Sequence, residues 1–208
     1  MKSYILQLSI LFLIEFLIIG MTSPVAAQEM VRAKIGIELF SGNGSTRART
    51  VEHIKTRDKL RIHVISEKDT YVYVVHTDQN KVTLLNKSKI IKNSALVLPP
   101  DNEYYLPDGL SETELFTVIC SPDELTEMST LFSSKNVSYS KWSEFEKRLV
   151  KKSRIDLEEK SVKPFEMAGN VRGNIESSKG RPVWSLDSLP LYSGKSLLVK
   201  KFRFNVKK

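Results

Sequence analysis

Short stretches in which apolar and polar residues alternate constrain the fold of this chain more than any other feature. In residues 31–40 every second side chain is apolar, and most of those between are charged; the apolar ones are Ala33, Ile35, Ile37 and Leu39. Side chains of a β-strand point to opposite faces in turn, so this period predicts a strand packed on one side. Residues 60–64 repeat the pattern with Leu60, Ile62 and Val64.

Other stretches predict further strands. Residues 71–75 and 115–120 are apolar on both faces, which is typical of central strands. Residues 82–85 follow a polar turn and should form a hairpin with the first of these. The remaining expected strands are residues 95–98, an edge strand at 183–186, and a last strand at 196–206 whose Phe202, Phe204 and Val206 face inward.

The period changes after residue 120. Serine is a favoured N-cap, proline suits the first helical position, and acids favour the positive end of a helix dipole. These rules predict a helix start at Ser121, Pro122, Asp123 and Glu124. The apolar stripe of this helix would be Leu125, Met128 and Leu131 or Phe132. A second helix is predicted over residues 141–152, with a stripe of Trp142, Phe145 and Leu149.

Many short strands with helices confined to one insertion predict a mainly β fold, a β-sandwich with one or two short helices. We expect one domain over residues 28–208. Its helical and irregular insertion would span about 121–182, and its closing strand about 196–206.

The N-terminal residues predict export. Lys2 precedes an apolar run at residues 4–21, and the small residues Val25, Ala26 and Ala27 follow. This order is typical of a secretory signal peptide over residues 1–27, cleaved after Ala27, which predicts a periplasmic or secreted protein. The alternative is a retained membrane anchor, against which Glu15 in the apolar run argues.

Charge and cysteine content narrow the expected partners. The single cysteine excludes a disulfide within the chain, which suits a bacterial periplasm. The net charge is +8, and in an exported protein it favours acidic proteins, anionic lipid headgroups or anionic cell-wall polymers over nucleic acid. The alternative is that this charge only keeps the protein soluble.

Part of the chain resembles a known family. The stretches 56–62, 69–75 and 78–85, then Leu98-Pro99-Pro100 and residues 109–120, resemble landmarks of the bacterial domain-of-unknown-function family 4384. The resemblance covers about residues 31–131; Arg57 and Asn80 stand where that family has glycine. It implies an immunoglobulin-like β-sandwich in an exported bacterial protein, and it implies no catalytic residues.

No constellation of residues predicts catalysis, a metal or a cofactor. Cys120 ends an apolar strand and is best interpreted as a buried thiol. The three histidines, His53, His63 and His76, match no compact metal motif, although His63 and His76 could be neighbours on adjacent strands. The Ser-Gly-Lys-Ser string at 193–196 lacks the earlier glycine of a phosphate loop.

Two basic clusters are the candidate interaction surface. One lies in the second helix and the other in the last strand: Lys147, Arg148, Lys151, Lys152 and Arg154, then Lys200, Lys201 and Arg203. If the strand lies near the helix, the two clusters would form one positive face. We therefore expect an exported, non-catalytic protein-binding module, an accessory or assembly factor for a cell-envelope complex. The alternative is a module that binds an anionic cell-wall polymer or a membrane surface.

Overall fold

The computed structural model describes residues 30–42, 44–78, 81–101, 103–133, 137–154 and 185–207. Sheet A has the order β2–β1–β4–β7, and β9 also pairs with β1. Its strands are β1 (Val31–Ser41), β2 (Gly44–Arg47), β4 (Lys59–Ser66), β7 (Ala95–Leu98) and β9 (Leu191–Gly194). Sheet B has the order β3–β10–β8–β5–β6. Its strands are β3 (Val51–Lys55), β5 (Thr70–Thr77), β6 (Val82–Ile90), β8 (Thr113–Ser121) and β10 (Leu198–Lys207).

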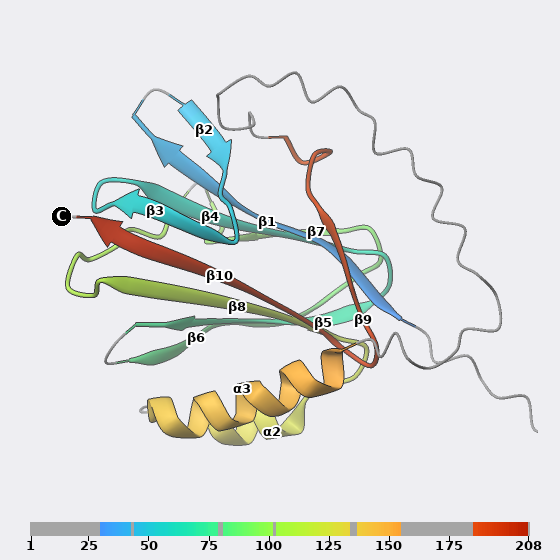
Figure 1. Ribbon diagram of the computed structural model, residues 1–208. Helices are drawn as coiled ribbons and strands as arrows, with labels where there is room; N and C mark the ends of the chain where they lie inside the picture. The colour runs from blue at the N-terminus through green and yellow to red at the C-terminus, as the bar shows by residue number, and fades with distance from the viewer. Residues whose placement is uncertain are drawn as a thin grey trace, which may run out of the picture.

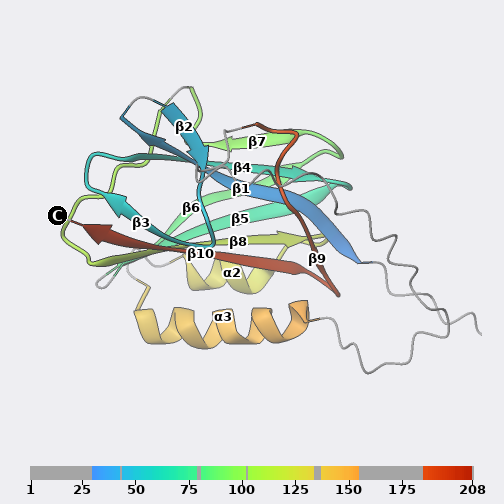
Figure 2. The ribbon, with the colours of Figure 1, turned by 45° about the horizontal axis from the view of Figure 1, so that its top comes forward.

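The described part of the protein has three layers. Sheet A covers one face of sheet B, and the helices α2 (Thr126–Leu131) and α3 (Tyr139–Ser153) lie on the other face (Figure 1). The turned view shows α3 running alongside the strands of sheet B (Figure 2). The fold is therefore mainly β, as predicted, and its two packed sheets are consistent with a β-sandwich.

The core between the sheets is built from the alternating strands. Ile35 and Ile37 of β1 and Ile62 of β4 are fully buried there. They meet inward residues of sheet B such as Phe116 and Phe204, whose rings pack edge to face with centroids 5.8 Å apart. The one-sided alternation predicted from the sequence is thus confirmed for β1, β4 and β10.

A second core explains why two strands are apolar on both faces. Tyr73 and Val75 of β5 and Ile119 of β8 point away from sheet A. They pack against the apolar stripes of the two helices, whose most buried members are Met128, Trp142, Phe145 and Leu149. The predicted central strands and helix stripes are therefore confirmed, because the helices bury the second face of sheet B.

The predicted start of the first helix is wrong. Ser121 is still the last residue of β8, and α2 begins only at Thr126, with Leu125 as an N-cap that offers no side-chain hydrogen bond. Pairing of Ser121 with Tyr71 of β5 extends the strand, so the ladder overrides the local capping pattern.

Three strands were missed by the sequence analysis. β2 and β3 lie within residues 44–55, for which the sequence analysis predicted no strand. β9 lies at Leu191–Gly194, whereas Ser185 and Leu186 of the expected edge strand 183–186 are not in a strand. Residues 183–184, the predicted signal peptide and residues 155–182 of the insertion lie outside the described residues.

The chain passes from sheet A to sheet B between β2 and β3. β3 then pairs parallel with β10, from Val51 opposite Arg203 to Lys55 opposite Lys207, whereas every other strand pair is antiparallel among the described residues. Among these residues, no helix has the length and hydropathy needed to cross a membrane.

Candidate functional site

Helix α3 presents a basic stripe on the side that its apolar stripe does not use. Lys147, Lys151 and Arg154 follow one another at spacings of four and three residues, which places them on one side of the helix end. All three side chains are exposed. Like charges at this spacing repel one another and weaken a helix by about 0.2–0.5 kcal/mol per pair. The negative end of the helix dipole offsets part of that cost for the last turn.

The end of α3 is tied to the beginning of β10. The backbone N–H of Val199 donates to Ser153 Oγ at 3.2 Å, and the Lys195 N–H donates to the Ser153 carbonyl oxygen at 3.2 Å. Ser196 Oγ donates to the carbonyl oxygen of Lys152 at 3.1 Å. The bonds from Lys195 and Ser196 satisfy carbonyl groups that a helix end leaves open, and all three bonds fix the helix against the last strand.

A buried carboxylate links the helix to sheet B. Glu146 accepts a hydrogen bond from Thr117 Oγ1 of β8 at 2.7 Å, and Lys201 Nζ of β10 lies 2.6 Å from its second oxygen. The Glu146 side chain is only 11% exposed, whereas that of Lys201 is 42% exposed. Glu146 is thus compensated by two partners, and the ammonium of Lys201 remains open to solvent.

Between the helix and the strand lies an open groove of about 470 Å³. Its walls are Lys147, Val150 and Lys151 of α3, Arg154 directly after the helix, and Lys201 of β10. Glu146 is the one acid among its lining residues. Glu146 and Lys201 offset each other, so Lys147, Lys151 and Arg154 give the groove an excess of positive charge around a small apolar contact at Val150. Such a site suits a carboxylate or phosphate group.

The groove brings together half of the predicted surface. Lys147, Lys151, Arg154 and Lys201 line it, so the prediction that the last strand lies near the second helix is confirmed for these residues. Lys152 is exposed beside the groove without lining it.

The other predicted residues lie elsewhere. Arg148 turns toward α2, where its guanidinium lies 3.2 Å from Glu127 and 5.3 Å from the Phe145 ring centroid. Arg203 lines a separate pocket with Asp78 and Tyr139. Lys200 lies on the other face of sheet B, since successive side chains of a strand point to opposite faces. Lys200 is therefore not on the face of sheet B that carries the groove, and Arg148 and Arg203 do not line the groove.

Glu146 was missed by the sequence analysis. It directly follows Phe145 and sits four residues after Trp142, so its position falls within the apolar stripe of α3. A carboxylate on the buried face of a helix needs a partner. The place of Glu146 in the apolar stripe could therefore have indicated a buried polar contact.

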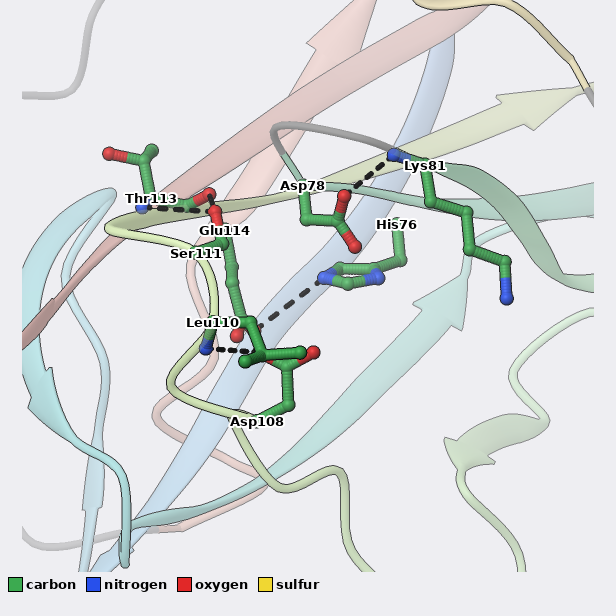
Figure 3. Close-up of polar contacts among 8 residues, drawn as sticks. All are labelled: His76, Asp78, Lys81, Asp108, Leu110, Ser111, Thr113 and Glu114. Atoms are coloured by element: carbon green, nitrogen blue, oxygen red, sulfur yellow. Dashed lines mark hydrogen bonds and ion pairs between the residues drawn. The ribbon is translucent and has the colours of Figure 1, made fainter.

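The two inner histidines do not form a shared site. His63 belongs to β4 of sheet A and pairs with Glu38 of β1 at 3.1 Å, where both side chains are buried. Burial lowers the pKa of His63, and the hydrogen bond that His63 donates to Glu38 opposes that shift. His76 belongs to β5 of sheet B and lies 3.5 Å from Glu114 of β8 (Figure 3). Within the described residues, no group of three or more His, Cys, Asp or Glu side chains is arranged to hold a metal ion.

Cys120 is a core residue. Its side chain is fully buried between the sheets, and this burial raises the pKa of the thiol to about 12. The thiolate, which is the reactive form, is therefore very rare near neutral pH. Its interpretation as a buried thiol is confirmed.

Comparisons of the chain with family models, with curated proteins and with solved structures found no match. The resemblance to family 4384 therefore stays a prediction.

Proposed function

We propose that this chain is an exported, non-catalytic binding module that holds an acidic segment of a protein partner in the groove between α3 and β10. In this role it would act as an accessory or assembly factor in the cell envelope. The proposal rests on the convergence of Lys147, Lys151 and Arg154 on one groove, whose single lining acid, Glu146, is paired with Lys201. Export remains part of the proposal through the predicted signal peptide.

The shape of the groove favours a peptide segment over a flat anionic surface. Its volume of about 470 Å³ lies within the usual range for ligand sites, so a few side chains fit into it. Val150 offers an apolar contact between the cations, which a peptide with mixed acidic and apolar residues can use. A broad polymer or membrane surface would gain more from cations spread over one face, but Lys200 and Lys201 point to opposite faces of sheet B.

We extend the proposal to the type of fold. The order β10–β8–β5–β6 and the pairing of β1 with β4 and β4 with β7 support an immunoglobulin-like sandwich, in which the last strands of the chain share a sheet with central hairpin strands. The resemblance to family 4384 supports the same fold. Modules of this type serve many unrelated functions, so the function rests on the groove and not on the fold.

The test uses a fluorescein-labelled deca-glutamate peptide and fluorescence anisotropy. The full chain without residues 1–27 should bind the peptide, and raising the salt from 50 to 300 mM should weaken binding steeply because the contacts are ionic. The double variant Lys147→Met and Lys151→Met should weaken binding about tenfold at low salt, since each exposed ion pair contributes about 0.2–1 kcal/mol.

Lys152→Met is the matched control, because it removes the same charge from the same helix outside the groove. Binding that falls equally in the control and in the double variant would contradict the groove as the site. Vesicles of phosphatidylglycerol form the second arm. If the wild type binds vesicles and not the peptide, the alternative of a module for anionic surfaces replaces this proposal.

A further inference from the structure

A second cavity lies on the opposite side of sheet B from the groove. Strand β1 has two partners on the same edge. It pairs with β2 only from Glu38 to Ser41 and with β9 only from Val31 to Lys34. The segment of β1 between them, which includes Ile35 and Gly36, forms part of the lining of a cavity of about 330 Å³. The aromatic residues Tyr192 and Phe202 also line it. Ile35 and Phe202 are buried, whereas Tyr192 is partly exposed, so Tyr192 is the ring that a ligand can reach.

Two arginines line this cavity as well. Arg47 is the last residue of β2, and Arg49 lies in the connection that carries the chain from sheet A to sheet B. The Arg47 guanidinium donates one hydrogen bond to the carbonyl oxygen of Ser188, which fixes its position. A guanidinium has five N–H donors, so one fixed bond leaves donors for a ligand.

A third cation stands against the same lining residues. Lys200 Nζ donates to Thr50 Oγ1 at 2.9 Å, and it lies 4.3 Å from the ring centroid of Tyr192 and 5.4 Å from that of Phe202. Thr50, Tyr192 and Phe202 all line the cavity. Burial lowers the pKa of Lys200, which means that its charged form is incompletely solvated. An anion in the cavity would compensate that charge.

One acid approaches from β3. Glu52 is buried, and its carboxylate accepts long hydrogen bonds from the backbone N–H groups of Arg49 at 3.4 Å and His53 at 3.3 Å. Neither Glu52 nor Lys200 is among the residues that line the cavity. The lining therefore carries positive charge without an acid.

We infer that this cavity is a binding site for a small organic anion. Its carboxylate or phosphate head would contact Arg47, Arg49 and the Lys200 ammonium that Thr50 holds, and its compact apolar body would pack against Tyr192. The cavity volume falls within the lower part of the usual range for small-molecule sites. This site is separate from the groove, and it does not depend on the proposed function.

The test titrates the ¹⁵N-labelled full chain without residues 1–27 with phenyl phosphate and with benzoate, following backbone amide shifts by NMR. Saturable shifts should appear at Gly36, Thr50 and Tyr192. The two probes distinguish a phosphate head from a carboxylate head. Inorganic phosphate tests the head group alone, and benzyl alcohol tests the ring alone; both should bind at least tenfold more weakly than the better organic anion.

Two neighbouring lysines provide a matched pair of variants. Lys200→Met should weaken binding of the better probe about tenfold or more, whereas Lys201→Met, on the opposite face, should change it less than twofold. The deca-glutamate peptide should show the reverse pattern, so failure of one site is distinguishable from failure of the other. An unchanged dissociation constant in Lys200→Met with native amide shifts elsewhere, or the absence of saturable shifts with either probe, would overturn the inference.

Discussion

The phenolic oxygen of Tyr73, in the middle of sheet B, accepts a hydrogen bond at 2.8 Å from the backbone N–H of Leu125, the residue that precedes helix α2. The side chain of Leu125 cannot cap the helix, and Tyr73 is fully buried beneath it. A strand residue thus holds the chain where it enters the helical layer.

Replacing Tyr73 with phenylalanine tests this link. Tyr73→Phe keeps the ring but leaves the Leu125 N–H without its acceptor, so the free energy of unfolding should fall by about 1–3 kcal/mol. Urea denaturation followed by circular dichroism measures it. Tyr139→Phe is the control, because Tyr139 is 54% exposed, and it should change stability by less than about 0.5 kcal/mol. Equal stability of Tyr73→Phe and the wild type would show that this hydrogen bond does not stabilise the fold.

Glu146 should stabilise the fold chiefly through its buried hydrogen bond to Thr117. Glu146→Ala removes the acceptor at 2.7 Å from a buried hydroxyl, so it should cost about 1–3 kcal/mol. Glu146→Gln keeps an acceptor and loses only the pairing with the partly exposed Lys201, so its cost should be clearly smaller. The measurement is again urea denaturation. Glu144→Ala, an exposed acid of the same helix, serves as the control, and a loss there as large as in Glu146→Ala would contradict this role.

The buried His63 should make the protein less stable in mild acid. Its pKa in the folded protein is lowered from 6.5, mainly by burial. Below about pH 6.5 the unfolded chain therefore binds more protons than the folded one, and the free energy of unfolding falls as the pH falls toward the folded pKa.

Unfolding free energies between pH 8 and pH 5 measure this effect. His63→Gln should show a shallower decline than the wild type over that range. His53→Gln, at an exposed position of β3, should keep the decline of the wild type. A decline in His63→Gln that matches the wild type would assign the acid sensitivity to other groups.

Cys120 should react with thiol reagents only when the protein unfolds. The thiol is fully buried, and its pKa is raised to about 12, so both access and thiolate formation are suppressed. Because the chain has one cysteine, the release of colour from a disulfide reagent reports this residue alone. Labelling at pH 8 should be slow in buffer and complete within the dead time in denaturing urea. Rapid labelling of the folded protein would show that the sheets open locally at β8.

The strongest sequence patterns predicted elements that the structure contains. Alternation placed Ile35 and Ile37 on the inner face of β1, and helical spacing placed Trp142 and Leu149 in the stripe of α3. These patterns succeed because each residue needs only to bury its side chain on a known side of a strand or helix. Ser121 shows where a local rule fails, since its pairing with Tyr71 extends β8 past the predicted helix start.

The sequence pattern of single segments could not predict which half of the candidate basic residues share the groove. Lys200 and Lys201 are adjacent in the chain, so the sequence analysis placed them in one cluster. In β10 their side chains point to opposite faces of sheet B: Lys200 lies against the ring of Tyr192, and Lys201 lines the groove. The short strands β2, β3 and β9 have no apolar periodicity of their own; they exist because β1 and β10 offer them hydrogen bonds.

By itself, the sequence determined which side chains are buried. Their spacing in turn determined the mainly β character and the two amphipathic helices. Only the tertiary structure decided which cations share a site. Burial follows from the composition of each short segment, whereas the meeting of Lys151 with Lys201 depends on hydrogen bonds between segments far apart in the chain, such as that from Val199 to Ser153.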